Sequence, residues 1–342
     1  MRIKSLVSSL ALSCLIILSS GSAYAMDSDC RGLENVSCVQ SNVTRLVTGL
    51  DGGSGSAIGP GNALYVPETN TGKIWRIDPR TGAKTLFASG LPQQIPGVGI
   101  GGVMDVAFLG GKAYALVTLV SPDVGGSDID GIYRIDGPDS YTVIADIGAF
   151  STANPPSTSY EIPTGVQYAL QTYRGGFLVT DGHHNRVLRV TLDGDVSEVI
   201  AFGDIVPTGL ATLGNTVYMA EAGPIPHNPQ DGQIVSFNLQ SPNEALVASG
   251  ASLLVDVEFG RGLRLYGLSQ GIHTTGGPGT PADHDTGALV EVNRDGTFTV
   301  ITDGLDQPTS MEFIGNTAYV VTLPGDVLEI TDVAGPPYGR FH

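Results

Sequence analysis

Five of the six histidines fall in loops of one kind, where each follows the second strand of a repeated unit. His183 and His184 belong to one unit, His227 to the next, and His273 and His284 to the one after that. Histidine suits metal ligation or proton transfer near neutral pH. We predict that His183 and His227 transfer protons and that the other three contact a substrate. The alternative is that these are ordinary exposed loops that bind nothing.

Five carboxylates form a second set. Glu68, Asp181 and Glu221 stand at matching positions, at the ends of second strands, whereas Asp105 and Asp256 lie early in apolar strands expected next to a central channel. Carboxylate oxygens are typical ligands of divalent cations. We predict that Asp105, Asp256 and Glu221 hold calcium, magnesium or zinc, and that Glu68 and Asp181 contact substrate. A carboxylate at a strand end can instead cap the following turn, and for Asp181 this alternative is favoured.

The elements that position these residues are internal repeats. Residues 63–68, 72–78 and 84–88 read as three short strands joined by turns. The same pattern returns five times, and a further apolar strand precedes each copy, as at 103–109. Four antiparallel strands in each unit of about 40–55 residues are typical of a propeller blade.

The sixth unit lacks its fourth strand, because the chain ends after residues 326–330. Residues 43–48 form an unassigned strand before the first blade, and we expect them to complete the last one. The predicted fold is therefore all-β, a six-bladed β-propeller with an N-terminal strand closing the ring. Turns on one face are short, whereas long connections such as 91–102, 149–162 and 269–287 gather on the other, where function is expected.

The composition narrows the partners. Lys and Arg number 17 against 34 Asp and Glu, which gives a net charge of −17. Such a surface does not attract nucleic acid or anionic membranes. Hydrophobic residues make up 41% of the chain, enough for a sizeable core, and no segment after the N-terminal one is apolar enough to span a membrane.

The N-terminus predicts export. Residues 1–25 combine a basic start, a short apolar run and an Ala-Tyr-Ala cleavage site, as a signal peptide does. The remaining Cys30 and Cys38 predict a disulfide within residues 26–42, and residues 43–342 form the propeller. We expect a periplasmic or secreted protein.

Residues 178–190 read Leu-Val-Thr-Asp-Gly-His-His-Asn-Arg-Val-Leu-Arg-Val, which resembles an NHL repeat. With its N-terminal signal and its Pro-Thr-Gly-Leu and Ala-Glu-Ala-Gly phrases, the chain resembles the exported ScyD/ScyE family. That resemblance implies a propeller associated with biosynthesis of scytonemin, an indole-derived pigment. Related propellers include gluconolactonases, paraoxonases, strictosidine synthases and streptogramin lyases.

Two functional hypotheses follow, and the sequence does not decide between them. The first is a small-molecule-binding propeller, acting as a metal-assisted lyase or hydrolase if it is an enzyme. The second is a non-catalytic propeller that binds a protein or polymer on the same face. An enzyme requires side chains that converge on a deep pocket, whereas an interaction surface spreads them over a shallow one.

Overall fold

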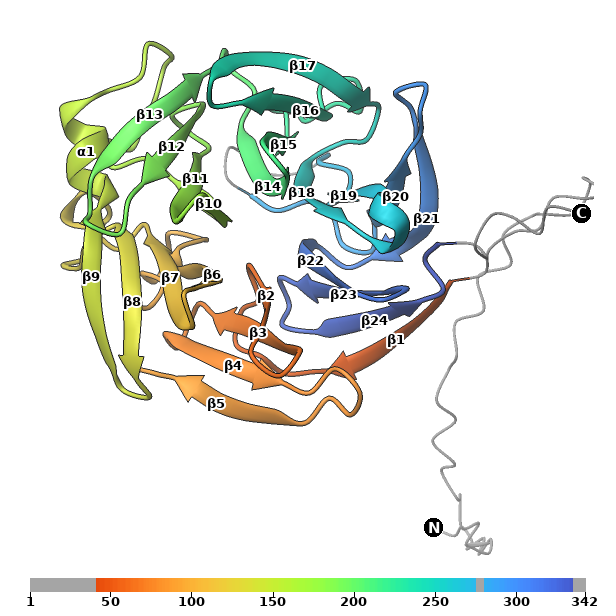
Figure 1. Cartoon of the computed structure of the whole chain (residues 1–342), viewed down its shortest axis with the longest axis horizontal. Coiled ribbons are helices and arrows are strands. Elements are labelled where there is room, and N and C mark those ends of the chain that lie inside the picture. Colours follow the sequence, from red (N-terminus) through yellow and green to blue (C-terminus); the bar gives the residue numbers. More distant parts are fainter. Residues whose placement is uncertain (1–40, 275–279, 335–342) are drawn as a thin grey trace, which may run out of the picture. The chain divides into compact units, whose positions relative to one another are not determined.

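The computed structural model describes residues 41–274 and 280–334, within one compact unit of the chain, Val39–His342. Six four-stranded antiparallel sheets stand around a central channel, and the predicted six-bladed β-propeller is confirmed (Figure 1). The predicted signal peptide and the predicted Cys30–Cys38 disulfide lie outside the described residues. Within the described ranges, no helix has both the length and the apolar character needed to cross a membrane.

Each blade has its first strand at the channel and its fourth at the rim. The strands of blades 1 to 3 are β2 (Ala57–Gly59), β3 (Ala63–Glu68), β4 (Lys73–Ile77) and β5 (Lys84–Ala88); β6 (Gly102–Leu109), β7 (Lys112–Thr118), β8 (Gly131–Gly137) and β9 (Ser140–Asp146); and β10 (Gln167–Tyr173), β11 (Gly176–Asp181), β12 (Arg186–Val190) and β13 (Val196–Ala201).

The strands of blades 4 to 6 are β14 (Pro207–Leu213), β15 (Thr216–Glu221), β16 (Gln233–Asn238) and β17 (Ser241–Ser249); β18 (Leu254–Phe259), β19 (Leu265–Ser269), β20 (Gly287–Val292) and β21 (Phe298–Leu305); and β22 (Pro308–Ile314), β23 (Thr317–Thr322), β24 (Val327–Thr331) and β1 (Asn42–Val47).

The ring closes as the sequence predicts. β1 pairs antiparallel with β24, so the first strand of the propeller completes the last blade. Val47 and the following Leu50 are buried in an apolar cluster that joins blades 6 and 1. Pairing β24 in this way leaves it without an open edge.

The hydrophobic core lies between blades. Six apolar clusters each combine side chains from two neighbouring blades, and together they run around the whole ring. For example, Leu116 and Ile132 of blade 2 pack with Phe177 and Leu188 of blade 3. Because neighbouring blades cover both faces of each sheet, β3, β11 and β19 are buried along their whole length.

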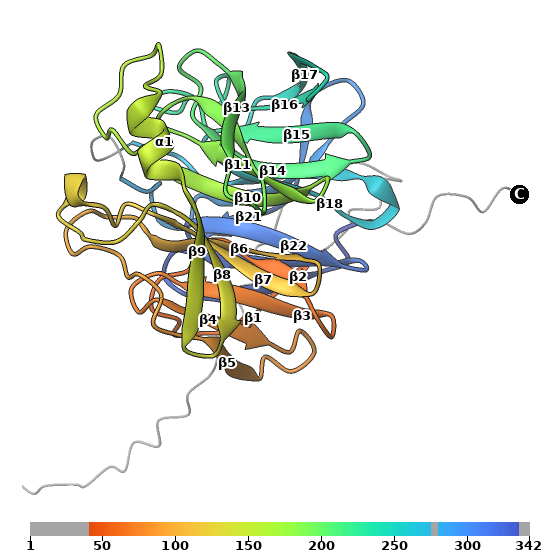
Figure 2. The same ribbon diagram turned by 60° about the vertical axis from the view of Figure 1, so that its left-hand side comes forward.

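The two ends of the channel differ. Tight hairpins close one end, as at Gly110 and Gly111, where φ values of 59° and 77° suit a turn that glycine favours. The long connections lie at the other end and include α1 (Ile147–Ala153), which the sequence analysis expected to be loop (Figure 2). α1 forms because the Asp146 side chain accepts a hydrogen bond from Ala149 N and caps its first turn. Two short 3₁₀ turns complete the structure, Pro122–Val124 and Arg261–Leu263.

Candidate functional site

A cavity of about 970 Å³ occupies the loop-rich end of the channel. The innermost strands of all six blades form its walls, and the long connections between blades 1 and 2, 2 and 3, and within blades 4 and 5 form its mouth. The face that carries the long connections therefore holds a concave pocket, and its volume lies in the range typical of small-molecule sites.

The lining is acidic. Six carboxylates contribute to it, and no lysine or arginine does among the residues that the structure describes. Glu161 and Asp204 are exposed at the mouth. The other four lie on the channel walls: Asp105, Asp256, Glu258 and Glu312.

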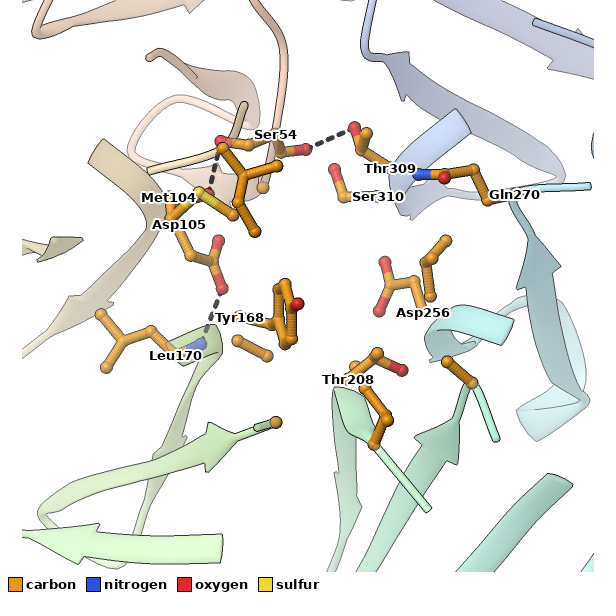
Figure 3. A pocket seen from close by; sticks show the side chains of 18 of the residues that line it. Ser54, Met104, Asp105, Tyr168, Leu170, Thr208, Asp256, Gln270, Thr309 and Ser310 are labelled. Carbon is orange, nitrogen blue, oxygen red and sulfur yellow. Dashed lines mark hydrogen bonds between the residues drawn. The ribbon is translucent and has the colours of Figure 1, made fainter. Parts of the chain in front are cut away.

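Asp105 and Asp256 occupy equivalent positions in blades 2 and 5, which face each other across the ring (Figure 3). Asp105 accepts hydrogen bonds from Val106 N at 2.8 Å and from Leu170 N of the next blade at 2.7 Å. Asp256 repeats this arrangement with Val257 N and with Met311 N, at 2.8 and 2.7 Å. Each carboxylate thus connects two neighbouring blades at the channel wall.

A glycine of the preceding blade leaves room for each of these aspartates. A Cβ atom at Gly55 would collide with Asp105, and one at Gly209 would collide with Asp256. Burial raises the pKa of Asp256 to about 7 and raises that of Asp105 well above its usual range, although the backbone hydrogen bonds oppose both shifts. The two groups hold the blades together and also point into the cavity.

Glu258 lies two residues after Asp256 in β18. Glu312 lies two residues after Ser310, which is the position in β22 that is equivalent to Asp256. Burial, together with the charge of Asp256, raises the pKa of Glu258 to about 8. The pKa of Glu312 is raised well above its usual range by burial and then by Glu258, Asp256 and Asp105. The sequence analysis missed both residues, although the alternation Asp256-Val257-Glu258 in an apolar strand would have placed two carboxylates on one face.

His183 lines the cavity beside a tyrosine that the sequence analysis did not select. The Tyr168 hydroxyl and His183 Nε2 lie 3.2 Å apart, within hydrogen-bonding distance. Burial lowers the pKa of His183 and raises that of Tyr168, so the pair holds a neutral imidazole and a neutral phenol near pH 7. Such a pair can pass a proton to or from a bound molecule.

His227 also lines the cavity, in the connection between β15 and β16. Its Nδ1 lies 2.7 Å from the carbonyl oxygen of Gly223, which assigns the proton to Nδ1 and leaves the lone pair of Nε2 as a proton acceptor. Burial lowers the pKa of His227, which favours this neutral form. The ring of His273 packs edge-on against it with centroids 5.4 Å apart, and His273 Nε2 lies 2.9 Å from the Thr280 hydroxyl.

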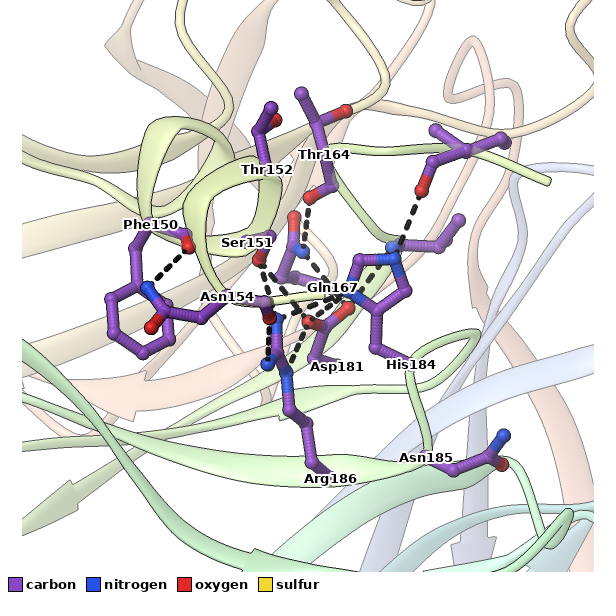
Figure 4. Close-up of polar contacts among 12 residues, drawn as sticks. Phe150, Ser151, Thr152, Asn154, Thr164, Gln167, Asp181, His184, Asn185 and Arg186 are labelled. Atoms are coloured by element: carbon purple, nitrogen blue, oxygen red, sulfur yellow. Dashed lines mark hydrogen bonds and ion pairs between the residues drawn. The ribbon is translucent and has the colours of Figure 1, made fainter. Parts of the chain in front are cut away.

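The remaining predicted substrate contacts do not line the cavity. Asp181 and His184 are buried within blade 3, where both contact the guanidinium group of Arg186 (Figure 4). Glu68 is buried in blade 1 and accepts hydrogen bonds from Asp51 N and the Thr71 hydroxyl. The ring of His273 packs against that of His227 and does not itself line the cavity. We therefore assign structural roles to these four residues.

His284 is exposed and pairs with Asp306 at 2.6 Å, outside the cavity lining. Its pKa is raised by the hydrogen bond to Asp306 and by that residue's charge.

The three predicted metal ligands are not brought together. Asp105 and Asp256 stand on facing walls with both oxygens bonded to backbone N–H groups, and Glu221 is outside the lining. Within the described ranges, no group of three or more His, Cys, Asp or Glu side chains is placed to hold a metal ion. These residues therefore do not fit the divalent-metal prediction.

Glu221 differs from its counterparts in blades 1 and 3. Glu68 has Lys73 at 3.7 Å and Asp181 has Arg186 at 3.0 Å, whereas the residue paired with Glu221 across the strands is Gln233. Glu221 is 3% exposed, its Oε1 has no hydrogen-bond partner, and burial raises its pKa to about 8. It is a buried carboxyl without a cation.

We expect Glu221→Gln to stabilise the protein above neutral pH. A carboxyl with a raised pKa binds its proton more tightly in the folded state, so its contribution falls as pH rises from about 4.5 to about 8. Relative to the original chain, the variant should gain roughly 4–5 kcal/mol in free energy of unfolding at pH 8.5 and little at pH 4.5. Urea denaturation at both pH values measures this, with the exposed Asp139→Asn as control. A gain that is equal at both pH values would contradict the assignment.

No family model matches this chain, and no curated protein sequence matches it. Similar solved structures include a gluconolactonase from Xanthomonas campestris, at TM-score 0.59 and 12% identity, over 85% of this chain and 89% of that one. A virginiamycin B lyase from Staphylococcus aureus matches at TM-score 0.51 and 13% identity, over 85% and 99%. The PQQ-bound aldose sugar dehydrogenase of Streptomyces coelicolor matches at TM-score 0.54 and 14% identity, over 86% and 98%. At these identities the likeness shows the fold alone: a six-bladed propeller of a kind that includes several enzymes.

Proposed function

We propose that this chain is an exported β-propeller that binds a small molecule in the cavity at its loop-rich end. Side chains of the cavity then transfer protons to and from that molecule. The observation that carries the proposal is that one cavity is lined both by His227, whose proton is held on Nδ1, and by the Tyr168–His183 pair. The depth of the cavity favours a small ligand over the alternative of a protein or polymer on a shallow surface.

The roles follow from the hydrogen bonds. His227 acts as the base, because Gly223 holds its proton on Nδ1 and Nε2 accepts a proton from the ligand or from a bound water. Tyr168, hydrogen-bonded to His183, acts as the acid that protonates the leaving group. One proton is removed and one is supplied, as a lyase or hydrolase reaction requires. The resemblance to the ScyD/ScyE family would place this reaction in secondary-metabolite biosynthesis, in a periplasmic or secreted protein.

Substitution of His227 should stop turnover while leaving the fold intact. Asn suits the test because it tolerates the left-handed φ of 58° at this position, and its amide can donate to Gly223 O while Nε2 is lost. Compounds retained by the protein are identified by affinity-selection mass spectrometry and then incubated to detect products. We expect His227→Asn to lower turnover by about 10²–10⁴-fold.

The control is Asn215→Ala, in the β14–β15 turn at the opposite end of the channel, which should change nothing. The proposal fails if no small molecule is retained, or if His227→Asn converts a retained compound as fast as the original chain.

A further inference from the structure

The cavity walls carry carboxyl groups, and no lysine or arginine accompanies them among the described lining residues. None of the ion pairs found among the described residues includes any of the six lining carboxylates. Elsewhere in the molecule, acidic side chains do have such partners, as Asp181 has Arg186. The described lining therefore combines six carboxyl groups with no lysine or arginine.

The four wall carboxyls have raised pKa values, so they are only partly ionised near neutral pH, and a cation bound beside them would favour their ionised forms. All four line the same cavity, and the charges of Glu258, Asp256 and Asp105 add to burial in raising the pKa of Glu312. Water screens charges less in a concave pocket than at a convex surface, so a cation that ionises these carboxyls would be attracted more strongly there. An added anion would oppose their ionisation and would meet no lysine or arginine among the described lining residues.

Apolar and aromatic side chains complete the lining. Met104, Phe108, Val255 and Met311 come from the inner strands, and Tyr160 comes from the mouth. These groups can bury a hydrocarbon or aromatic body, and the aromatic faces attract cations as well. The complementary ligand therefore has two parts, an apolar body and a positive charge.

We propose that the cavity selects ligands that carry a basic amine on an apolar body, with the ammonium group held near Asp256 and Glu312, and that it rejects carboxylates and phosphates. This inference rests on the proposed binding function and specifies its ligand class. One favourable and one unfavourable effect produce this selectivity. The carboxyl groups of the walls attract the amine, and an anionic group finds no basic partner among the described lining residues.

Three probes of matched shape test the charge alone: 4-phenylbutylamine, 4-phenylbutanol and 4-phenylbutanoate. Dissociation constants are measured by calorimetry at pH 9 with the mature protein, because the pKa values of about 7 for Asp256 and about 8 for Glu258 lie below this pH while the amine is still protonated. We expect the amine to bind at least tenfold more tightly than the alcohol, and the carboxylate to bind most weakly. Glu312→Gln should weaken amine binding about tenfold and leave alcohol binding unchanged.

Asp193→Asn is the matched control, because it removes the same charge from an exposed turn at the other end of the channel. It should leave all three constants unchanged. Equal binding of amine and alcohol, tighter binding of the carboxylate, or binding of none of the three would overturn the charge selectivity. In each case, compounds still retained in affinity selection would show that the proposed binding function survives, whereas their absence would show that it fails as well.

Discussion

Replacing Arg186 with methionine should lower the free energy of unfolding by about 3–5 kcal/mol, the usual cost of breaking a buried ion pair from one side. Arg186 is 1% exposed, and its guanidinium group donates to Asp181 and Ser151 at 3.0 Å and to Asn154 O at 2.7 Å. Methionine fills much of the same space but leaves the buried Asp181 carboxylate without a cation. Urea denaturation at pH 7 measures the loss.

Arg189→Met supplies a control on the same strand, because Arg189 is only half-buried and its hydrogen bonds are to backbone oxygens at 3.3 and 3.5 Å. Its cost should be below about 1 kcal/mol. The double variant Asp181→Asn/Arg186→Met should be less destabilised than the sum of its single changes, since the two side chains interact directly. A loss below 1 kcal/mol for Arg186→Met would contradict the assignment.

The Arg186 cluster also supports the mouth of the cavity. Arg186 donates a hydrogen bond to Asn154 O, and His184 Nε2 lies 3.0 Å from Ile162 O. Both ends of residues 154–162 are therefore attached to blade 3 (Figure 4). Tyr160 and Glu161, which line the mouth, lie between these two anchors. The buried cluster in blade 3 therefore positions part of the site without entering the cavity.

Removing β1 should cost several kcal/mol or prevent the propeller from closing. A chain that begins at Asp51 loses the pairing of β1 with β24 and the burial of Val47 and Leu50. Burial of two such side chains contributes about 3–6 kcal/mol, before the strand hydrogen bonds are counted. The truncation also exposes β24 as an edge strand that can pair with another molecule.

The comparison is with a chain that begins at Ser41, which retains β1 (Asn42–Val47). Thermal unfolding and size-exclusion chromatography distinguish the two, and we expect the shorter chain to melt earlier and to associate. If both chains melt at the same temperature as monomers, β1 does not close the ring.

The fold could be predicted because it repeats. Each blade shows the same strand and turn pattern, and the six copies and the missing fourth strand were sufficient to predict the ring and its closure. α1 was missed because seven residues give too little periodicity, and its main determinant is the single capping contact of Asp146.

The site was predicted only in part, for a different reason. The sequence correctly indicated which face carries the long loops, and the structure places His183 and His227 at one cavity. The sequence did not show that the Asp181 carboxylate pairs with Arg186. It also did not show that Asp105 and Asp256 accept hydrogen bonds from backbone N–H groups of the next blade. These contacts depend on packing between blades, which residue type and spacing along the chain do not specify.

The central claim is that the cavity binds a small molecule between His227 and the Tyr168–His183 pair. The most direct measurement is a crystal structure of the protein with a compound recovered by affinity selection. The account predicts density for the compound inside the cavity, with one polar atom within hydrogen-bonding distance of His227 Nε2 and another within reach of Tyr168 or His183. A compound bound outside the cavity, or inside it without contact to these three side chains, would contradict the account.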